Sequence, residues 1–347
     1  MDILVVGSGG REHALVANLS KNPKVERLFA LPGNAGMARV ATLVPIGTKN
    51  LDKIVRFAKQ EKIDFVVVGP DDPLVLGLVD LLEAENIPCF GPDKCSAILE
   101  GSKVFSKALM KRYQIPSATY EVFDRVEDAL AYAQRCALPS VVKADGLALG
   151  KGVIIAHTKE VLQATIKAMM VDKVFGPSGE RIIIEEFLSG PEVSVLTFTD
   201  GVSLVPMPSS MDHKRAFDGD QGPNTGGMGV IAPNPFYTPA IEDLCMRTIF
   251  LPTMHAMNKE GRTFKGCLYF GLMLTEGGPK VIEYNARFGD PEAQAVLALL
   301  ESDLLSIMMA VSQQMLSSVE VKFSSEASCC VVLASAGYPG PYETGKR

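Results

Sequence analysis

The chain has 347 residues, 47% of them hydrophobic, and its 34 basic and 40 acidic side chains give a formal net charge of −6. A chain this long exceeds one ordinary core, so two or three domains are expected. The acidic balance and the lack of a basic run argue against nucleic acid or an anionic membrane surface as a partner.

Two further features indicate a cytoplasmic protein. No apolar run approaches the length of a membrane span, and the N-terminus reads as a strand rather than a signal peptide. The seven cysteines are odd in number and include no C-x-x-C, which favours free thiols in a reducing compartment over disulfides or zinc.

The first hundred residues alternate between strand and helix patterns. Apolar runs that end in Gly or Pro turns are typical of buried strands, and amphipathic stretches follow them. The expected strands are 1–7, 27–31 and 64–69, and the expected helices are 13–19, 51–62 and 74–86. This alternation predicts a parallel sheet with helices on both faces, with ligands at the carboxyl ends of the strands. Those ends are residues 7–11, 32–36 and 69–73.

The turn GSGGRE at residues 7–12 resembles a dinucleotide-binding turn but departs from it twice. Glu12 stands where a third glycine is needed, and the second strand ends in Leu31-Pro32-Gly33 rather than in an acidic ligand for ribose. An anion at the helix start remains compatible with the turn. A nicotinamide cofactor is therefore disfavoured.

A helical stretch at 96–113 leads to a second unit that is also mixed. Strands are expected at 118–123, 140–144, 153–156, 181–188 and 193–199, with helices at 126–136 and 159–171. A helix near 241–257, a hairpin of strands 266–275 and 280–287 turning at 276–278, and a strand at 327–335 follow.

Lys143 ends a buried-looking strand and runs into a glycine-rich loop, KADGLALGKG, that leads to another strand. The loop lacks the spacing and the following helix of a P-loop. A flap over a triphosphate is expected instead, with Lys143 on the floor and Lys151 on the flap, and its glycines predict mobility without nucleotide. The alternative is that Lys143 is a gatekeeper on an edge strand.

Acidic residues end the strand at 182–188. Successive side chains point to opposite faces, so Glu185 and Glu186 cannot share one role. One of them is expected near an adenine amino group, and Glu192, beyond a turn, near ribose hydroxyls. This signal is weak by itself.

The strand VIEYNAR at 281–287 carries a stronger signal. Its period of two places Glu283, Asn285 and Arg287 on one face. A carboxylate and an amide oxygen suit Mg²⁺, which prefers few protein ligands together with nucleotide phosphates. Arg287 would hold a phosphate or carboxylate through two hydrogen bonds. The alternative is the solvated face of an antiparallel strand.

The segment 212–228, DHKRAFDGDQGPNTGGM, is almost free of apolar residues in a hydrophobic chain. A long polar loop inside a compact domain is usually functional, although a solvated surface loop is the simpler alternative. Its glycines would let backbone N–H groups close on an anionic substrate.

These motifs together resemble the ATP-grasp ligases. The order KADGLALGKG, EEFLSGPE and EYNARFGDPE carries the resemblance, and GSGGREH, PGNAG and DHKRAFDGDQGPNTGGMG narrow it to the phosphoribosylamine–glycine ligase (glycinamide ribonucleotide synthetase) family from end to end. One departure is Tyr269, at a position where many ATP-grasp enzymes have another metal carboxylate.

The resemblance implies an α/β fold in three parts. These are a Rossmann-like N-terminal domain over 1–101, an ATP-grasp domain over 102–318 with a lid at about 116–190, and a truncated C-terminal domain over 319–347. The family continues beyond the last residue, so a fragment is expected. A monomer or weak dimer is expected as well.

The resemblance also assigns residues to substrates. It implies Arg287, Lys214 and Asp212 as catalytic and Glu283 and Asn285 as ligands of Mg²⁺ or Mn²⁺. For ATP it implies Lys103, Lys143, Lys151, Glu185, Glu186, Leu188 and Glu192. For the other substrates it implies Gly9, Gly10, Asn34, Asp71, Pro73, His213, Gly226, Gly227 and Asp290.

The implied reaction joins glycine to 5-phosphoribosylamine in purine biosynthesis, with glycyl phosphate as the intermediate and ADP and phosphate as products. Two alternatives remain open. One is a related ATP-grasp ligase or carboxylase that acts on another purine intermediate, and the other is a nucleotide-binding regulatory protein without turnover.

Overall fold

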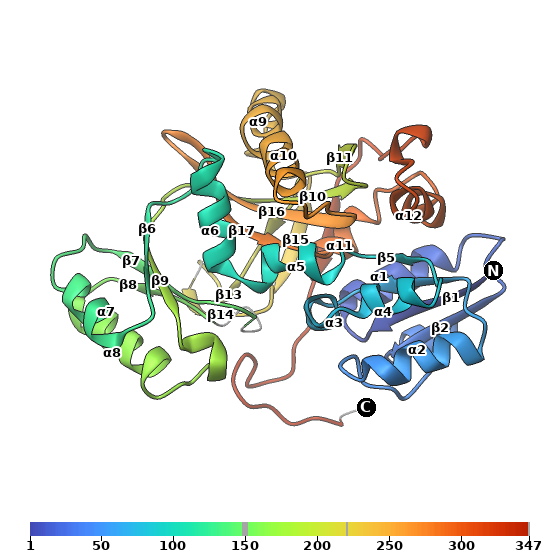
Figure 1. The fold of residues 1–347 in the computed structure, drawn as a ribbon, viewed down its shortest axis with the longest axis horizontal. Coiled ribbons are helices and arrows are strands. Elements are labelled where there is room, and N and C mark those ends of the chain that lie inside the picture. The colour runs from blue at the N-terminus through green and yellow to red at the C-terminus, as the bar shows by residue number, and fades with distance from the viewer. Residues whose placement is uncertain (148–151, 220, 346–347) are drawn as a thin grey trace.

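The computed structural model describes residues 1–147, 152–219 and 221–345. Three sheets set out the architecture. The N-terminal sheet, in blue, and the sheet that contains β6 to β9, in green, lie at opposite ends of the molecule, with the sheet of β10, β16 and β17 between them (Figure 1). Within the described residues, no helix is both long enough and apolar enough to cross a membrane.

The N-terminal sheet is parallel, in the order β3-β2-β1-β4-β5. Successive residues of β1 enter two different hydrophobic clusters, because helices cover both faces of the sheet. The predicted parallel sheet is thus confirmed. Its strands are β1 (Asp2–Gly7), β2 (Arg27–Pro32), β3 (Thr42–Leu43), β4 (Phe65–Val68) and β5 (Cys89–Phe90), and its helices are α1 (Gly10–Leu19), η1 (Met37–Arg39), α2 (Leu51–Gln60), α3 (Asp71–Leu76) and α4 (Leu78–Ala84).

Two stretches expected as single helices are each divided in two. Gly77, with φ of +96°, separates α3 from α4, since a left-handed residue ends one helix before the next begins. Ser102 separates α5 (Lys94–Gly101) from α6 (Lys103–Arg112), and its hydroxyl caps α6 by accepting from Phe105 N at 3.1 Å. The second break lies beside the glycine-rich loop, since Ser102 Oγ donates to Asp145 at 3.0 Å.

The green sheet is antiparallel, in the order β6-β9-β7-β8. It has a hydrophobic core of its own with two helices. Because β7 lies between β9 and β8, the interpretation of Lys143 as an edge-strand gatekeeper is wrong. The elements are β6 (Tyr120–Phe123), α7 (Val126–Ala133), β7 (Ser140–Ala144), β8 (Val153–Ala156), α8 (Lys159–Met170), η2 (Gly176–Gly179) and β9 (Ile182–Glu186).

The central sheet is antiparallel, in the order β11-β10-β16-β17. The predicted hairpin of β16 and β17 is confirmed. The strands are β10 (Glu192–Thr199), β11 (Leu204–Pro206), β16 (Gly266–Thr275) and β17 (Gly278–Asn285), and the helices are α9 (Pro239–Cys245), η3 (Met246–Phe250), α10 (Leu251–Lys259), α11 (Glu292–Val296), α12 (Leu304–Ser312) and η4 (Leu316–Ser318).

The polar segment 212–228 has more regular structure than the expected loop. It begins in a three-stranded sheet, in the order β12-β15-β18, and its middle forms a small hairpin of β13 and β14. The strands are β12 (Met211–Asp212), β13 (Arg215–Phe217), β14 (Gln221–Asn224), β15 (Gly229–Ala232) and β18 (Ser328–Val331). Backbone pairing therefore takes up many of the polar groups that the sequence offers to a ligand.

Candidate active site

The glycines of the first turn make room for Glu12. A Cβ atom on Gly7 would lie 2.3 Å from Glu12 Cγ, and one on Gly69 would lie 2.3 Å from Glu12 Oε1. The carboxylate is 1% exposed and accepts from Gly9 N at 2.7 Å. Arg11 Nε pairs with its other oxygen at 2.5 Å. This turn therefore encloses its own carboxylate, which explains why its glycines do not follow the dinucleotide pattern.

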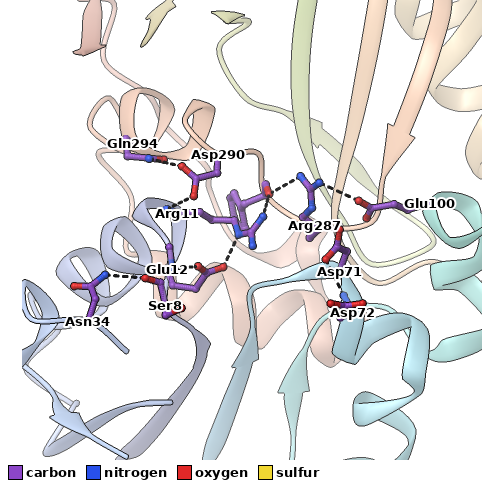
Figure 2. A network of polar contacts seen from close by, with 12 residues as sticks. Ser8, Arg11, Glu12, Asn34, Asp71, Asp72, Glu100, Arg287, Asp290 and Gln294 are labelled. Atoms are coloured by element: carbon purple, nitrogen blue, oxygen red, sulfur yellow. Dashed lines mark hydrogen bonds and ion pairs between the residues drawn. The ribbon is translucent and has the colours of Figure 1, made fainter. Parts of the chain in front are cut away.

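A carboxylate from a distant part of the chain lies at the start of α1. Asp290 accepts from Arg11 N at 3.2 Å and from Gln294 at 2.6 Å, and Figure 2 shows it beside Arg11. Asn34 donates to Ser8 O at 3.0 Å and accepts from Gly36 N at 2.9 Å. The backbone N–H groups of Gly9 and Arg11 and the side chain of Asn34 are thus engaged within the protein, although the sequence offered them to a substrate anion. Carboxylates in this position suit hydroxyl or ammonium groups better than a phosphate.

Three buried charged side chains, two from the green sheet and one from α6, lie close together. Lys143 Nζ, on β7, lies 3.1 Å from Glu185 on β9 and donates to Ile282 O at 2.9 Å. Lys107, on α6, lies 3.7 Å from the same carboxylate and donates to Ala118 O at 2.7 Å. Burial lowers the pKa of Lys107 to about 8, even though Glu185 acts in the opposite direction. Glu185 Oε1 is buried and has no hydrogen-bond partner in the part of the chain that the structure describes.

The first residues of the glycine-rich loop are attached to the start of α6. Asp145 accepts from Ser102 Oγ at 3.0 Å and from Val104 N at 3.1 Å, and it also pairs with Arg181. Lys103 Nζ donates to Gly146 O at 2.9 Å. Burial lowers the pKa of Lys103. A second lysine therefore faces this loop beside Lys143.

The other candidate ATP residues are more exposed. Glu186 lies on the opposite face from Glu185, as the alternation predicts, and accepts from Thr119 N at 3.0 Å and Lys280 at 3.0 Å. Leu188 follows β9 and is half-buried, and Glu192 begins β10 and is exposed. Lys151 lies outside the described residues.

Glu283 and Asn285 lie on β17 opposite Gly271 and Tyr269 of β16. No described residue donates a hydrogen bond or forms an ion pair with the Glu283 carboxylate. Burial acts to raise the pKa of Glu283, but four nearby cations outweigh this effect, so the pKa is lowered. These cations are Lys214, Lys143, Lys103 and Arg287. The described residues include no group of three or more His, Cys, Asp or Glu side chains able to hold a metal ion. An unpaired carboxylate beside an amide oxygen fits a Mg²⁺ ion that takes its other ligands from phosphates and water.

Tyr269 belongs to a buried hydrogen-bonded group instead of a metal shell. Its hydroxyl lies 2.8 Å from Ser194 Oγ and donates to Glu292 at 3.1 Å. This leaves Glu283 and Asn285 as the candidate metal ligands of this strand.

Arg287 follows β17 and lies within a charged network (Figure 2). Its Nη2 is 3.0 Å from Glu100 and 3.3 Å from Asn285 Oδ1. Burial works against the cation, but Glu100 and Asp71 outweigh it and raise the pKa of Arg287. The side chain thus shares a face with Asn285, as the strand period predicts.

The polar segment brings Asp212 and Lys214 to the same region. Lys214 Nζ lies 3.5 Å from Glu192. This contact joins Lys214, which is expected to bind phosphoribosylamine, to Glu192, which is expected to bind ATP. Burial and the nearby Glu292 raise the pKa of Asp212 to about 8. A Cβ atom on Gly227 would lie 2.4 Å from Pro291 Cδ and 2.7 Å from Asp212 Oδ1, so the expected close backbone approach is present.

The remaining predicted substrate residues surround this region. His213 N donates to Gly229 O at 2.9 Å, and Gly226 N donates to Tyr338 Oη at 2.9 Å. Asp71 and Pro73 lie in the first turn of α3, where Asp71 faces Arg287 (Figure 2). Gly10 lies so close to Gln294 that a Cβ atom there would be 2.4 Å from Nε2.

Sequence reasoning missed Glu100, Lys107, Tyr338 and Glu292. A charged side chain on the apolar side of a helix is a signal that could have identified Glu100 and Lys107, since buried charges are rare unless they are paired. No local pattern identifies Tyr338 or Glu292, because their partners are distant in sequence.

A parallel N-terminal sheet, an antiparallel sheet with a buried lysine, and a hairpin that ends in Glu-x-Asn-x-Arg define an ATP-grasp ligase. Family models for the N domain and the ATP-grasp (A) domain of phosphoribosylglycinamide synthetase match residues 1–100 and 101–293. The chain belongs to this family. All seven of its cysteines are free.

Individual relatives agree with the family. A phosphoribosylamine–glycine ligase from Vibrio vulnificus is 48% identical over 99% of this chain and 81% of its own length. One from Caldanaerobacter subterraneus subsp. tengcongensis is 46% identical over 99% and 83%. The crystal structure of phosphoribosylamine–glycine ligase from Thermotoga maritima has a TM-score of 0.84 and 34% identity over 98% of this chain and 82% of that one. A biotin carboxylase from Campylobacter jejuni, at 16% identity over 97% of this chain and 77% of that one and a TM-score of 0.74, shares the fold alone.

Proposed function

We propose that this chain joins glycine to 5-phosphoribosylamine at the expense of ATP and releases glycinamide ribonucleotide, ADP and phosphate. The observation that carries the proposal is the end of β17, where Arg287 donates to Asn285, Lys143 donates to Ile282 O at 2.9 Å, and the charges of Lys103, Lys143 and Lys214 act on Glu283. The named relatives and the two family models support the same activity.

The chemistry explains why such a site needs so many cations. A glycine carboxylate oxygen attacks the γ-phosphorus of ATP, the bond to ADP breaks, and glycyl phosphate forms. The amine of phosphoribosylamine then attacks the acyl carbon, loses a proton, and displaces phosphate. No covalent enzyme intermediate is needed, so the protein contributes positioning and neutralisation of charge.

The residues divide between the two substrates. Lys103, Lys143 and Lys151 would hold the phosphates of ATP, with Glu185, Glu186, Leu188 and Glu192 around the nucleoside. Glu283 and Asn285 would hold Mg²⁺ or Mn²⁺, which when bound neutralises phosphate charge. Arg287 would neutralise the acyl phosphate.

Phosphoribosylamine would lie between the N-terminal and central domains. Asp71 and Asp290 offer acceptors to its hydroxyls and amine, and Lys214 offers a donor to its phosphate. The N–H groups of Gly226 and Gly227 are already engaged with Tyr338 and Thr225, so these glycines would contribute space for close approach of the backbone. Asp212 faces the same space with a buried oxygen, Oδ1, that has no hydrogen-bond partner among residues 1–147, 152–219 and 221–345. Because its pKa is raised to about 8, Asp212 would hold a proton at neutral pH and donate a hydrogen bond to the substrate, while the departing phosphate would take the proton that the attacking amine loses.

A steady-state assay tests the proposal. ADP release should require glycine and phosphoribosylamine together, and glycinamide ribonucleotide should appear in equal amount. ADP release with bicarbonate or another purine intermediate instead would favour a related ligase or carboxylase. ATP binding without any turnover would favour a regulatory protein. The proposal also includes a cytoplasmic location. It further includes a monomer or weak dimer, and sedimentation would test this oligomeric state.

A further inference from the structure

Two arginines from different domains donate to one backbone carbonyl group. Arg11 Nη1, from α1, lies 3.1 Å from Phe288 O, and Arg287 Nη1 lies 3.2 Å from the same oxygen. Figure 2 shows the two guanidinium groups on either side of it. Two like charges converge here only because each has a carboxylate of its own, Glu12 for Arg11 and Glu100 for Arg287.

Glu100 holds both the backbone and the side chain at the end of β17. One of its oxygens accepts from Ala286 N at 2.7 Å, and the other is 3.0 Å from Arg287 Nη2. The residue is 7% exposed and lies near the end of α5. A buried carboxylate that satisfies a backbone N–H and a guanidinium together fixes their relative position.

These contacts leave one direction open for Arg287. Its Nη1 and Nη2 donate to protein oxygens, whereas its Nε is buried and has no partner among the described residues. A buried guanidinium N–H without a partner is costly, so its retention indicates an acceptor that arrives with the substrate.

We propose that Glu100 is a positioning residue, which holds Arg287 so that its Nε faces the reacting groups, and that Arg11 completes this arrangement from the N-terminal domain. Glu100, Arg11, Arg287 and the Phe288 carbonyl group are called the arginine clamp below. The inference rests on the proposed function, since it takes Arg287 as the group that meets the acyl phosphate.

The clamp also joins the two substrate regions. The N–H of Arg11 donates to Asp290, while its guanidinium reaches Phe288 O, two residues before Asp290 in the chain. The start of α1 and the end of β17 are therefore held together through one residue. A change in Arg11 should consequently disturb phosphoribosylamine more than ATP.

Glu100→Gln tests the first part of the inference. The amide can still accept from Ala286 N, but it loses the charge that holds Arg287. We expect kcat to fall by about 10- to 100-fold, as for other residues that orient a functional group, with an unchanged dissociation constant for ATP. Asp200→Asn is the matched control, because Asp200 is a buried acid that accepts from Ser203 N and Leu316 N far from the site. It should lower the unfolding midpoint and leave kcat alone.

A double-mutant cycle distinguishes positioning from mere stability. In an Arg287→Lys background, Glu100→Gln should cost less than about threefold in kcat, because the group it positions is already altered. An equal cost in both backgrounds would overturn the inference. So would full activity of Glu100→Gln.

Arg11→Met keeps the test valid if Glu100→Gln does not fold. It should raise KM for phosphoribosylamine by about tenfold or more and leave the KM for ATP within about twofold. Equal effects on both substrates would contradict the coupling through the clamp. The wild-type chain in the same assay separates the two levels, because a lack of glycine-dependent turnover there refutes the proposed function itself.

Discussion

The charged groups on the strands and those on the polar segment 212–228 are arranged in different ways. Lys143, Glu185 and Arg287 are buried or nearly so and held by ion pairs at 3.0 to 3.1 Å. Lys214 on the polar segment is half-buried and reaches Glu192 only at 3.5 Å. The strand charges are therefore held in place before any ligand binds, as the proposed contacts with ATP and the acyl phosphate require, whereas the contact of Lys214 is longer and more exposed, as suits the proposed contact with the second substrate.

Glu283→Gln should produce the largest effect, because it removes a strand carboxylate that has no partner among the described residues and that is the proposed metal ligand. We expect turnover at limiting Mg²⁺ to fall by at least about 100-fold, while the similar shape of the side chain preserves the fold. Kinetics over a Mg²⁺ titration, with circular dichroism as the control, would measure this. Unchanged activity at low Mg²⁺ would remove Glu283 from the metal site.

Lys143→Ala tests the buried strand charge that is proposed to contact the ATP phosphates. It leaves Glu185 with Lys107 alone and removes a partner of the ATP phosphates, so the dissociation constant for ATP should rise by about 10- to 100-fold. Calorimetry would measure the change. Lys265→Ala is a matched control outside the proposed site, since Lys265 pairs with Glu83 at 3.2 Å, and it should have a much smaller effect. Equal losses in both variants would refute a phosphate role for Lys143.

Lys214→Ala tests the proposed role of the polar segment 212–228 in binding phosphoribosylamine. We expect the KM for phosphoribosylamine to rise by about tenfold and the affinity for ATP to change less. The contact with Glu192 makes the opposite result informative as well. If ATP affinity falls while the phosphoribosylamine constant is retained, the polar segment belongs to the nucleotide site, and the division of the two pockets is incorrect.

Asp212→Asn should give the smallest effect on turnover, and its main effect should be a change in how stability depends on pH. The pKa of this carboxyl rises from 3.8 to about 8 on folding, so between these values the folded state keeps a proton that the unfolded state has released. Stability from this group is therefore complete at low pH and is lost as pH rises towards 8. The unfolding midpoint of the variant, relative to wild type, should increase from pH 5 to pH 9. A constant difference would show that Asp212 is ionised throughout.

The sequence predicted most of the elements and some of the contacts among the candidate site residues. Hydrophobic runs were enough for the parallel sheet and the hairpin of β16 and β17, because burial sets both patterns. The strand period was enough to place Asn285 and Arg287 together. The two helix breaks were not predicted, because a left-handed Gly77 and a capping Ser102 look like ordinary residues within an amphipathic stretch.

The contacts between distant parts of the chain could not be predicted in the same way. Glu100 meets Arg287 across 187 positions, and Lys107 meets Glu185 across 78. The sequence also offered the Gly9 amide to a substrate, although Glu12 accepts from it. Such pairings depend on how domains pack, and local periodicity contains no information about that.

The buried Glu12 limits the evolutionary routes open to this turn. To become a dinucleotide-binding turn, it would need glycine at position 12, which would empty the space between Gly7 and Gly69 and leave Arg11 without its carboxylate. An unpaired Arg11 would then face Arg287 across the Phe288 carbonyl group. Glu12→Gly alone would thus weaken the ligase before any new cofactor could bind.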